Sequence, residues 1–304
     1  MIYTLTFNPS IDYYLVCDHL SVGDINRIDK YEFIAGGKGI NASRMLAEIG
    51  IENSCVFLAG GFSGAFLVDE VAKDARIRVI PIKVEEPNRI NVKIRHEKET
   101  DLNTKGPQVS KEAEEELLTY FEKLEEKDYV IISGSLQNKE LVSSIQKIAE
   151  LVNPTGAKLV LDVPNMSLEQ IIETKASLIK PNLEELQAML ESDKRFPEIL
   201  EEAREKILKK GVGSILLSMG GDGGCYVDHE RSYWIQGPKL KPLNTVAAGD
   251  SMLSVTIGYL SEGHSIEESI CYGAAAGSAA VMAPYIPSQQ QIEEMVKEIK
   301  VVEL

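Results

Sequence analysis

The 304-residue sequence has no uninterrupted apolar run of about 18 residues, so it predicts no membrane-spanning helix. Its opening residues, MIYTLTFNPS, lack the basic segment and long apolar core of a secretory signal peptide, and the cytoplasm is the expected location. Basic residues are in deficit: 32 Lys and Arg stand against 47 Asp and Glu, a formal net charge of −15. That balance argues against nucleic acid as the main partner.

Patterns that bind metals or form disulfides are also missing from the sequence. The four cysteines have no C-x-x-C spacing, and the four histidines are equally isolated. The sequence therefore suggests neither a zinc site nor a disulfide framework. Internal repeats and low-complexity linkers are absent as well.

What the chain does contain is an alternation of short β-branched runs with longer amphipathic ones. Strands are predicted at residues 2–8, 55–61, 129–135, 159–163, 177–182 and 214–219, and helices at 111–127 and 196–210. Several of these strands are almost wholly apolar, as in a parallel sheet covered on both faces. The predicted fold is α/β: a doubly wound, mainly parallel sheet with helices on both faces, which binds ligands at the carboxyl ends of its strands.

Two segments, about 9–35 and 87–106, break this alternation because they read as β strands without helices between them. We expect them to form a small β-sheet that stands off the main sheet, either as a lid or as an oligomer contact. Residues 1–304 are expected to form one domain that carries this lid.

A glycine-rich stretch at residues 36–39 (GGKG) comes directly before an amphipathic helix. The apolar residues of that helix recur at helical spacing from Ala42 to Ile49, and Gly50 follows as a typical helix end. Backbone N–H groups at a helix start attract anions, and glycines allow a ligand to approach closely. The stretch indicates a phosphate or sugar-hydroxyl site, or simply a glycine-rich turn. It is not a Walker A loop, because glycine follows the lysine where serine or threonine is required.

A second stretch places Ala247, Ala248, Gly249 and Asp250 at the start of an apolar helix. Backbone N–H groups there could hold a developing negative charge. Asp250 is interpreted either as a general base that takes a proton from a substrate hydroxyl or as the N-cap of the helix.

Two further stretches are rich in small residues. LLSMGGDGGCYV (216–227) predicts a hairpin or a loop under a nucleotide, but no G-x-G-x-x-G opens a helix there, which argues against a dinucleotide-binding fold. In residues 263–281, Ser265 and Glu268 form a predicted capping box. The small residues 273–278 that follow indicate tight helix packing or a face for a flat ligand such as adenine.

Taken in order, these and other motifs resemble the phosphofructokinase B branch of the ribokinase superfamily over nearly the whole chain. The matching motifs are TFNPSIDY (6–13), AGGKGINASR (35–44), RINVKI (89–94), ETDLN (99–103), ISGSL (132–136), KPNLEEL (180–186), SMGGDGG (218–224), NTVAAGDSM (244–252) and AAAGSAA (274–280).

The resemblance implies transfer of the γ-phosphoryl group of ATP, with Mg²⁺, to a hydroxyl of a phosphorylated sugar. Within the branch, the chain is similar to 1-phosphofructokinases, which convert fructose 1-phosphate to fructose 1,6-bisphosphate. Tagatose-6-phosphate kinases are the near alternative. A catalytically silenced sensor of sugar phosphates or nucleotides is the alternative from another class.

The resemblance also implies roles for individual residues. Asp250 would be the base, and the backbone of Ala247, Ala248 and Gly249 would form the anion hole. Residues implied to bind the phosphosugar are Asp12, Gly36, Gly37, Lys38, Asn41, Arg89 and Ser135, with Arg27 and Lys105 as helpers. Residues implied to bind ATP are Asn182, Ser218, Gly220, Gly221, Gly223, Gly249, Gly273, Gly277 and Ser278, and those near Mg²⁺, mostly through water, are Glu185 and Asp162.

Two other features follow from the resemblance. Relatives usually have glycine where Ala247 stands, so alanine there is strained if the position needs a positive φ. The lid of relatives often serves as a dimer contact, and we therefore expect a homodimer formed through the lid.

Overall fold

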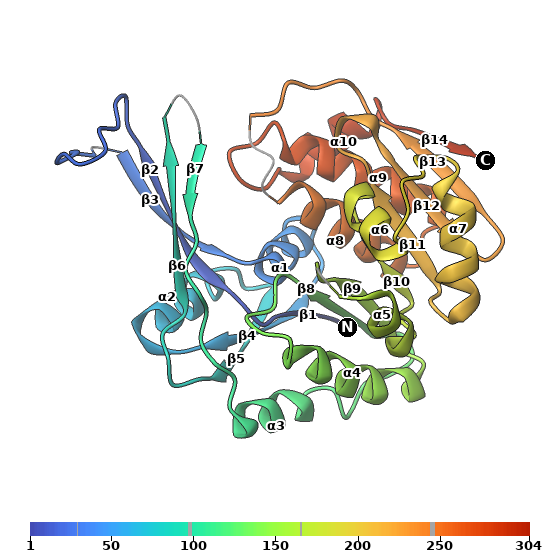
Figure 1. The fold of residues 1–304 in the computed structure, drawn as a ribbon, viewed down its shortest axis with the longest axis horizontal. Coiled ribbons are helices and arrows are strands. Elements are labelled where there is room, and N and C mark those ends of the chain that lie inside the picture. The colour runs from blue at the N-terminus through green and yellow to red at the C-terminus, as the bar shows by residue number, and fades with distance from the viewer. Residues whose placement is uncertain (29, 97–98, 165, 244–246) are drawn as a thin grey trace.

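The computed structural model describes residues 1–28, 30–96, 99–164, 166–243 and 247–304. Within these residues the chain forms a ten-stranded main sheet and a separate four-stranded sheet (Figure 1). The strands of the main sheet are β1 (Ile2–Thr6), β4 (Asn53–Ala59), β5 (Ile77–Lys83), β8 (Tyr129–Ser133), β9 (Lys158–Asp162), β10 (Leu178–Ile179), β11 (Ser214–Ser218), β12 (Gly224–Asp228), β13 (Ser232–Gln236) and β14 (Lys300–Glu303).

The strand order in the main sheet is β14-β13-β12-β11-β10-β9-β8-β1-β4-β5. All neighbouring pairs from β11 through β5 are parallel, and β12, β13 and β14 join antiparallel at the other edge. The predicted mainly parallel α/β sheet is confirmed.

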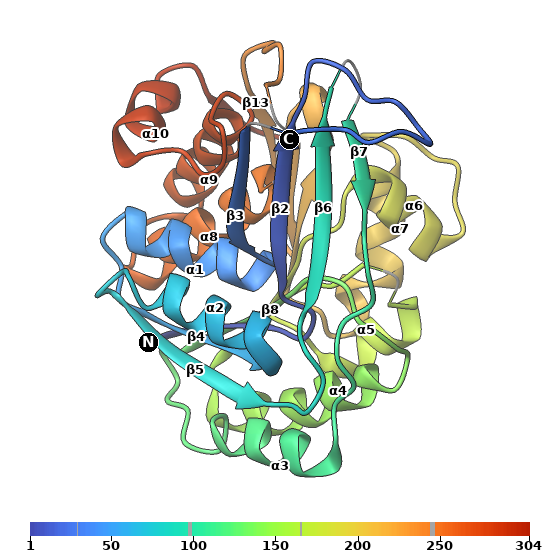
Figure 2. The ribbon, with the colours of Figure 1, turned by 90° about the vertical axis from the view of Figure 1, so that its left-hand side faces the viewer.

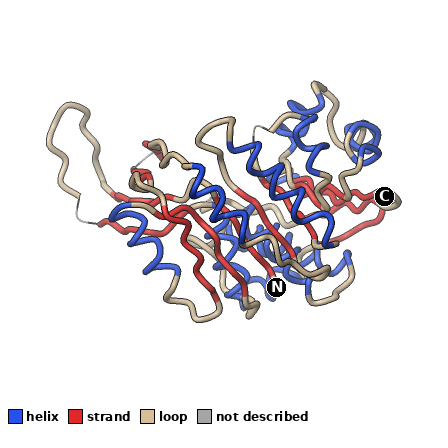
Figure 3. Tube along the Cα trace, turned by 90° about the horizontal axis from the view of Figure 1, so that it is seen from below, coloured by secondary structure: helices blue, strands red, loops and turns tan. Residues whose placement is uncertain are grey.

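Helices cover both faces of this sheet (Figure 3). They are α1 (Lys38–Glu48), α2 (Gly61–Val71), α3 (Lys111–Thr119), α4 (Leu141–Val152), α5 (Leu168–Thr174), α6 (Leu183–Leu190), α7 (Ile199–Lys206), α8 (Ala248–Ser261), α9 (Ile266–Ala280) and α10 (Gln289–Val296). Successive strand residues point to opposite faces, so Ile132 packs in one core with α3 to α7, and Ile131 packs in another with α1 and α8 to α10. None of the described helices is long and apolar enough to cross a membrane.

Three predicted elements are shorter than expected. The strand at 177–182 is reduced to Leu178–Ile179, and the chain leaves the ladder before Pro181, which has no N–H to donate. The helix at 111–127 ends at Thr119, after which Phe121 turns into the core. The helix at 196–210 begins only at Ile199, beyond a proline, and ends at Lys206. The sequence patterns therefore predicted where these three elements lie, but not where they begin and end.

The four-stranded sheet is the predicted lid (Figure 2). Its order is β3-β2-β6-β7, made of β2 (Ser10–Val16), β3 (Lys30–Gly36), β6 (Arg89–Arg95) and β7 (Glu99–Leu102). β2 pairs antiparallel with β3 and parallel with β6, whereas β7 pairs antiparallel with β6. These strands come from the two segments that the sequence set apart from the α/β alternation.

The pairing register sorts the lid residues onto two faces. Asp12 of β2 lies opposite Asn91 of β6, so both project from one face, which is rich in polar side chains. Tyr13 lies opposite Phe33 on the other face, where their rings stack with centroids 4.2 Å apart. The lid therefore has one polar face and one aromatic face.

Candidate active site

Asp250 lies in the first turn of α8, with its side chain buried. The N-cap of this helix is Ala247, and no side chain caps it, so the interpretation of Asp250 as the N-cap is wrong. The carboxylate instead accepts a hydrogen bond from Asn41 Nδ2 of α1 at 2.8 Å. A buried acid that is not needed as a cap, and that a residue 209 positions away holds in place, is available for chemistry.

The surroundings of Asp250 tune its acidity. Burial raises the pKa of Asp250 to about 6, with the nearby Asp162 adding to the rise, while Lys38 and the hydrogen bond from Asn41 oppose it. A carboxylate with a pKa close to neutrality is ionised at physiological pH and is still basic enough to accept a proton.

The backbone before Asp250 carries the strain that the sequence suggested. Ala247 has φ 64° and ψ 0°, in the left-handed region that favours glycine. The N–H groups of Ala248 and Gly249 begin the helix and so have no partner inside it. Asn244, Thr245 and Val246 of the same motif lie outside the described residues.

Two lysines flank a buried aspartate beside this helix start. Asp162, at the end of β9, receives Lys38 Nζ at 3.0 Å and Lys180 Nζ at 3.4 Å. A Cβ on Gly249 would lie 3.1 Å from Lys180 Nζ, so this lysine reaches the same helix start. Burial acts to lower the pKa of Lys38, but the carboxylates of Asp162 and Asp250 outweigh it, and that pKa is raised.

Lys180 was given no role from the sequence. A signal was available, because Asp162 ends β9 and Lys180 directly follows β10, and the ends of such parallel strands share one edge of the sheet.

The glycines of the GGKG stretch bring the start of α1 to this cluster. Gly37 is the N-cap of α1 with φ 120°, and a Cβ on Gly39 would lie 3.0 Å from the backbone of β1. A Cβ on Gly36 would lie 2.5 Å from a carboxylate oxygen of Asp12. The glycines are therefore required by close packing, which also sets Lys38 as the first residue of the helix.

The polar face of the lid supplies a second group of side chains. Asp12 accepts hydrogen bonds from Ser10 Oγ at 2.8 Å and from Asn91 Nδ2 at 3.1 Å. Burial lowers the pKa of Arg89, against the opposing effect of Asp12, and its Nε is buried without a hydrogen-bond partner among the described residues. The guanidinium is thus partly desolvated and retains bonding capacity for an anion.

The N-x-x-E element forms a capping box at the start of α6. Asn182 Oδ1 accepts from the backbone N–H of Glu185, and Glu185 Oε2 accepts from the backbone N–H of Asn182, both at 2.8 Å. Asn182 also bridges to Ser218 at the end of β11.

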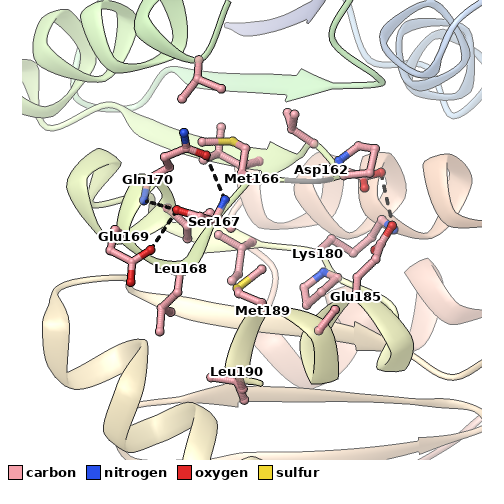
Figure 4. A pocket seen from close by; sticks show the side chains of 18 of the residues that line it. Asp162, Met166, Ser167, Leu168, Glu169, Gln170, Lys180, Glu185, Met189 and Leu190 are labelled. Carbon is pink, nitrogen blue, oxygen red and sulfur yellow. Dashed lines mark hydrogen bonds and ion pairs between the residues drawn. The ribbon is translucent and has the colours of Figure 1, made fainter. Parts of the chain in front are cut away.

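A cleft of about 790 Å³ opens beside the element and runs between α5 and α6. Asp162, Lys180 and Glu185 lie together at one end of it, and Met166 and Met189 line its middle (Figure 4).

The two other glycine-rich stretches have structural explanations. The predicted hairpin is confirmed: β11 and β12 pair antiparallel around a turn at Gly220–Asp222, and a Cβ on Gly223 would lie 2.1 Å from a backbone oxygen of β13. A Cβ on Gly273 would lie 2.0 Å from Thr256 Oγ1, so α9 packs closely on α8. Packing alone accounts for Gly273, and an ATP contact there stays a prediction.

Several predicted site residues lie away from Asp250 or have another partner. Arg27 and Lys105 are exposed in loops beside the lid strands, and Ser135 Oγ accepts a hydrogen bond from Asn8 at 3.2 Å. Only half of the predicted capping box at α9 is formed. Ser265 Oγ accepts a hydrogen bond from the N–H of Glu268, but the carboxylate of Glu268 contacts His264 and not the backbone of Ser265.

Comparison with known proteins decides the family. Residues 5–286 match the pfkB family of carbohydrate kinases. The chain belongs to this family. It is 32% identical over its full length, and over all of the relative, to 1-phosphofructokinase of Bacillus subtilis, and 30% identical over the full length of both chains to D-tagatose-1-phosphate kinase of Bacillus licheniformis.

A solved structure has the same fold. Phosphofructokinase-2 of Escherichia coli, in complex with fructose-6-phosphate, superposes with a TM-score of 0.88 at 26% identity, covering 97% of this chain and 98% of that one. The chain is thus a pfkB-family carbohydrate kinase with the ribokinase-like α/β fold and its four-stranded lid.

Proposed function

We propose that this kinase transfers the γ-phosphoryl group of ATP to a hydroxyl of a ketohexose 1-phosphate, with fructose 1-phosphate as substrate and fructose 1,6-bisphosphate as product. The sugar hydroxyl loses its proton to Asp250, its oxygen bonds to the γ-phosphorus, and the bond from that phosphorus to the β–γ bridging oxygen breaks to release ADP. The observation that carries the proposal is the buried Asp250, held by Asn41 at the start of α8.

The charges around Asp250 support phosphoryl transfer. This reaction needs little covalent chemistry from the protein and depends on positioning and on neutralising charge. Lys38 and Lys180 bring two cations to the cluster, and the N–H groups of Ala248 and Gly249 can face the transferring group. Asp12 and Arg89 on the polar face of the lid would bind the sugar and the phosphate it already carries.

The donors near this cluster also fit Mg²⁺. Among the described residues, no group of three or more His, Cys, Asp or Glu side chains could enclose a metal, and Mg²⁺ bound with nucleotides takes most of its ligands from phosphate and water. Asp162 has one buried oxygen, Oδ2, that makes no hydrogen bond and is approached only by Lys180 at 3.4 Å, and Glu185 uses only one oxygen in its capping box. These two carboxylates would hold Mg²⁺, largely through water, and the ion would neutralise phosphate charge.

ATP would lie along the carboxyl ends of the strands. We assign its phosphates to the bridged pair Asn182 and Ser218 and to Gly249, which lies close to Lys180 Nζ. The nucleoside would then contact the turn at Gly220–Gly223 and the small-residue face of α9 near Gly277 and Ser278. In this arrangement the phosphate chain would lie near Lys180 and the helix start that carries Asp250.

A substrate panel tests the proposal. ADP release should be measured with fructose 1-phosphate, tagatose 1-phosphate, fructose 6-phosphate, tagatose 6-phosphate and unphosphorylated fructose. We expect the largest kcat/KM for fructose 1-phosphate. A larger value for unphosphorylated fructose would contradict a phosphosugar kinase, and no turnover with any sugar would favour the sensor interpretation.

Tagatose 1-phosphate is the second candidate, because one relative that is 30% identical over the full chain is named for it. It replaces tagatose 6-phosphate as the closest competitor. Tagatose and fructose differ only in configuration at carbon 4, so the two substrates present the same phosphate and differ in one hydroxyl. The ratio of their kcat/KM values decides between them, and a ratio above about tenfold corresponds to about 1.4 kcal/mol of discrimination.

The aromatic face of the lid supports a homodimer. Tyr31 and Phe33 are 62% and 46% exposed on this face, and Leu102 of β7 is 55% exposed. We propose that the aromatic faces of two lids pack together. Sedimentation should then give a dimer for the native chain and a monomer for Phe33→Glu. A monomeric native chain at micromolar concentration would contradict this arrangement.

A further inference from the structure

Tyr285 connects the C-terminal part of the chain to the catalytic cluster. It lies in the loop between α9 and α10, which no sequence motif singled out. Its hydroxyl contacts Asn41 Oδ1 and lies 3.1 Å from the carbonyl oxygen of Ala35. Asn41 in turn donates from Nδ2 to Asp250 Oδ2 at 2.8 Å. One hydroxyl, one amide and one carboxylate therefore form a chain.

The hydrogen of the hydroxyl can be assigned within this chain. Ala35 O also accepts a hydrogen bond from Arg44 Nη1 at 3.0 Å, whereas the donor that the structure gives Asn41 Oδ1 is the hydroxyl of Tyr285. An ionised Asp250 is an acceptor only, so Asn41 must present its NH₂ group to it and its carbonyl oxygen to Tyr285. Burial raises the pKa of Tyr285, so the phenol stays protonated and remains a donor.

We propose that Tyr285 is a positioning residue for phosphoryl transfer: by donating to Asn41 Oδ1, it fixes the amide in the orientation that directs its NH₂ group at Asp250. Without this donor, only the carboxylate would orient the amide, and the hydrogen bond from Asn41 Nδ2 to Asp250 would be held less firmly. The proposal rests on the assignment of Asp250 as the base.

The other charged groups near these three hydrogen-bonded side chains stay in place when Tyr285 is replaced. Those that act on Asp250 are Lys38, Asp162 and Lys180, and those that act on Tyr285 are Arg44, Asp12 and Tyr14. Replacing Tyr285 by phenylalanine removes a single oxygen and leaves all six in place. It also keeps the ring that Arg44 approaches, at 5.9 Å from its centroid.

The first test is the pH profile of kcat/KM for the phosphosugar, compared between native enzyme and Tyr285→Phe. The hydrogen bond from Asn41 acts to lower the pKa of Asp250, so a weaker bond in Tyr285→Phe should raise that pKa. The acid limb of the profile, where kcat/KM falls as Asp250 is protonated, should then move to higher pH by about 0.3 to 1 unit. Activity near pH 6 should fall by about 1.5- to 5.5-fold, as the ionised fraction of Asp250 falls over that range of shifts, whereas activity near pH 8.5 should stay within about twofold and the KM for ATP should not change.

Tyr226→Phe is the matched control. Tyr226 is a buried tyrosine of β12 in the core below α8 and α9, and it is not part of the chain to Asp250. Its loss of a hydroxyl should leave the acid limb in place. An unmoved limb in Tyr285→Phe, or an equal shift in both variants, would overturn the proposal.

A double-mutant cycle with Asn41→Ala tests the route. If Tyr285 acts through the amide, Tyr285→Phe shifts the limb no further once Asn41 is alanine. Additive shifts would show that Tyr285 acts by another path and would overturn the proposal. Asp250→Asn tests the base assignment separately from the positioning role of Tyr285. If this variant leaves kcat and the acid limb intact, the base assignment fails. If it abolishes turnover while Tyr285→Phe changes nothing, only the positioning role fails.

Discussion

Ala247 offers a test of backbone strain at the catalytic helix. Its φ of 64° costs a residue with a Cβ about 1–2 kcal/mol, which glycine does not incur. Glycine at this position also gains freedom in the unfolded chain, which costs about 0.4–1 kcal/mol. Ala247→Gly should therefore raise the free energy of unfolding by up to about 1.6 kcal/mol, with a central value near about 0.8 kcal/mol, which corresponds to a rise of about 1–3 °C in the midpoint of thermal unfolding.

The same substitution should preserve or improve turnover. The anion hole would be built from N–H groups, and alanine and glycine each supply one. Losing such a donor costs about 10²–10³ in kcat in other enzymes, so a slightly misdirected peptide should cost less. We expect kcat of Ala247→Gly to be unchanged or up to about tenfold higher.

Lys175→Gly is the control for strain alone, because Lys175 has φ 48° at the end of α5, and the structure gives it no part in the site. It should gain similar stability without any change in kcat. Steady-state kinetics and thermal unfolding of the three proteins decide the matter. A tenfold loss of kcat in Ala247→Gly would mean that the methyl group packs usefully, and a loss of stability would refute the strain argument.

Four further predictions follow from the site. Asp250→Asn should lower kcat by at least about 10²-fold with little change in the KM for ATP, and a kcat within a few-fold of native would place the base elsewhere. In the native enzyme, log(kcat/KM) should fall with a slope of one below about pH 6, because a pKa raised to about 6 protonates Asp250 there; a flat profile down to pH 5 would contradict that pKa. Arg89→Ala should raise the KM for phosphosugar at least about tenfold and leave the KM for ATP within twofold, whereas equal increases would assign Arg89 to the nucleotide. Gly273→Ala should lower the free energy of unfolding by about 1–3 kcal/mol, because its Cβ would lie 2.0 Å from Thr256 Oγ1; a variant as stable as the native chain in denaturant titration would mean that α8 and α9 adjust freely.

The parts of the site that could be predicted from the sequence are those that short local motifs indicate. The glycines before α1 and the small residues before α8 mark helix starts, and helix starts attract anions wherever they occur. The motif itself offered Asp250 as a base or an N-cap, and the family resemblance then favoured the base and added Asn41 as a predicted sugar-binding residue. That these two residues hydrogen-bond each other was not predicted, because the contact spans 209 positions of the chain.

The residues that sequence reasoning missed act through distant partners. Tyr285 reaches Asn41 across 244 positions from a loop without regular structure, and no local pattern indicates such a contact. The N-cap interpretation of Asp250 failed for a related reason. It assumed that the helix begins after Asp250, whereas the left-handed backbone at Ala247 starts the helix three residues earlier.

The pairing of two lysines with one buried aspartate explains how a chain of net charge −15 can receive phosphates. The two lysines, Lys38 and Lys180, offset much of the negative charge of Asp162, Asp250 and the nearby Glu185 before a substrate arrives. Breaking a buried ion pair typically costs about 3–5 kcal/mol, because one charge is left without a partner. Because Asp162 is paired with two lysines, it would keep one of them if the other turned to a phosphate, and it would then avoid that cost. Asp162 would thus position both lysines, and one of them could leave its ion pair to bind a substrate phosphate while the other stays paired.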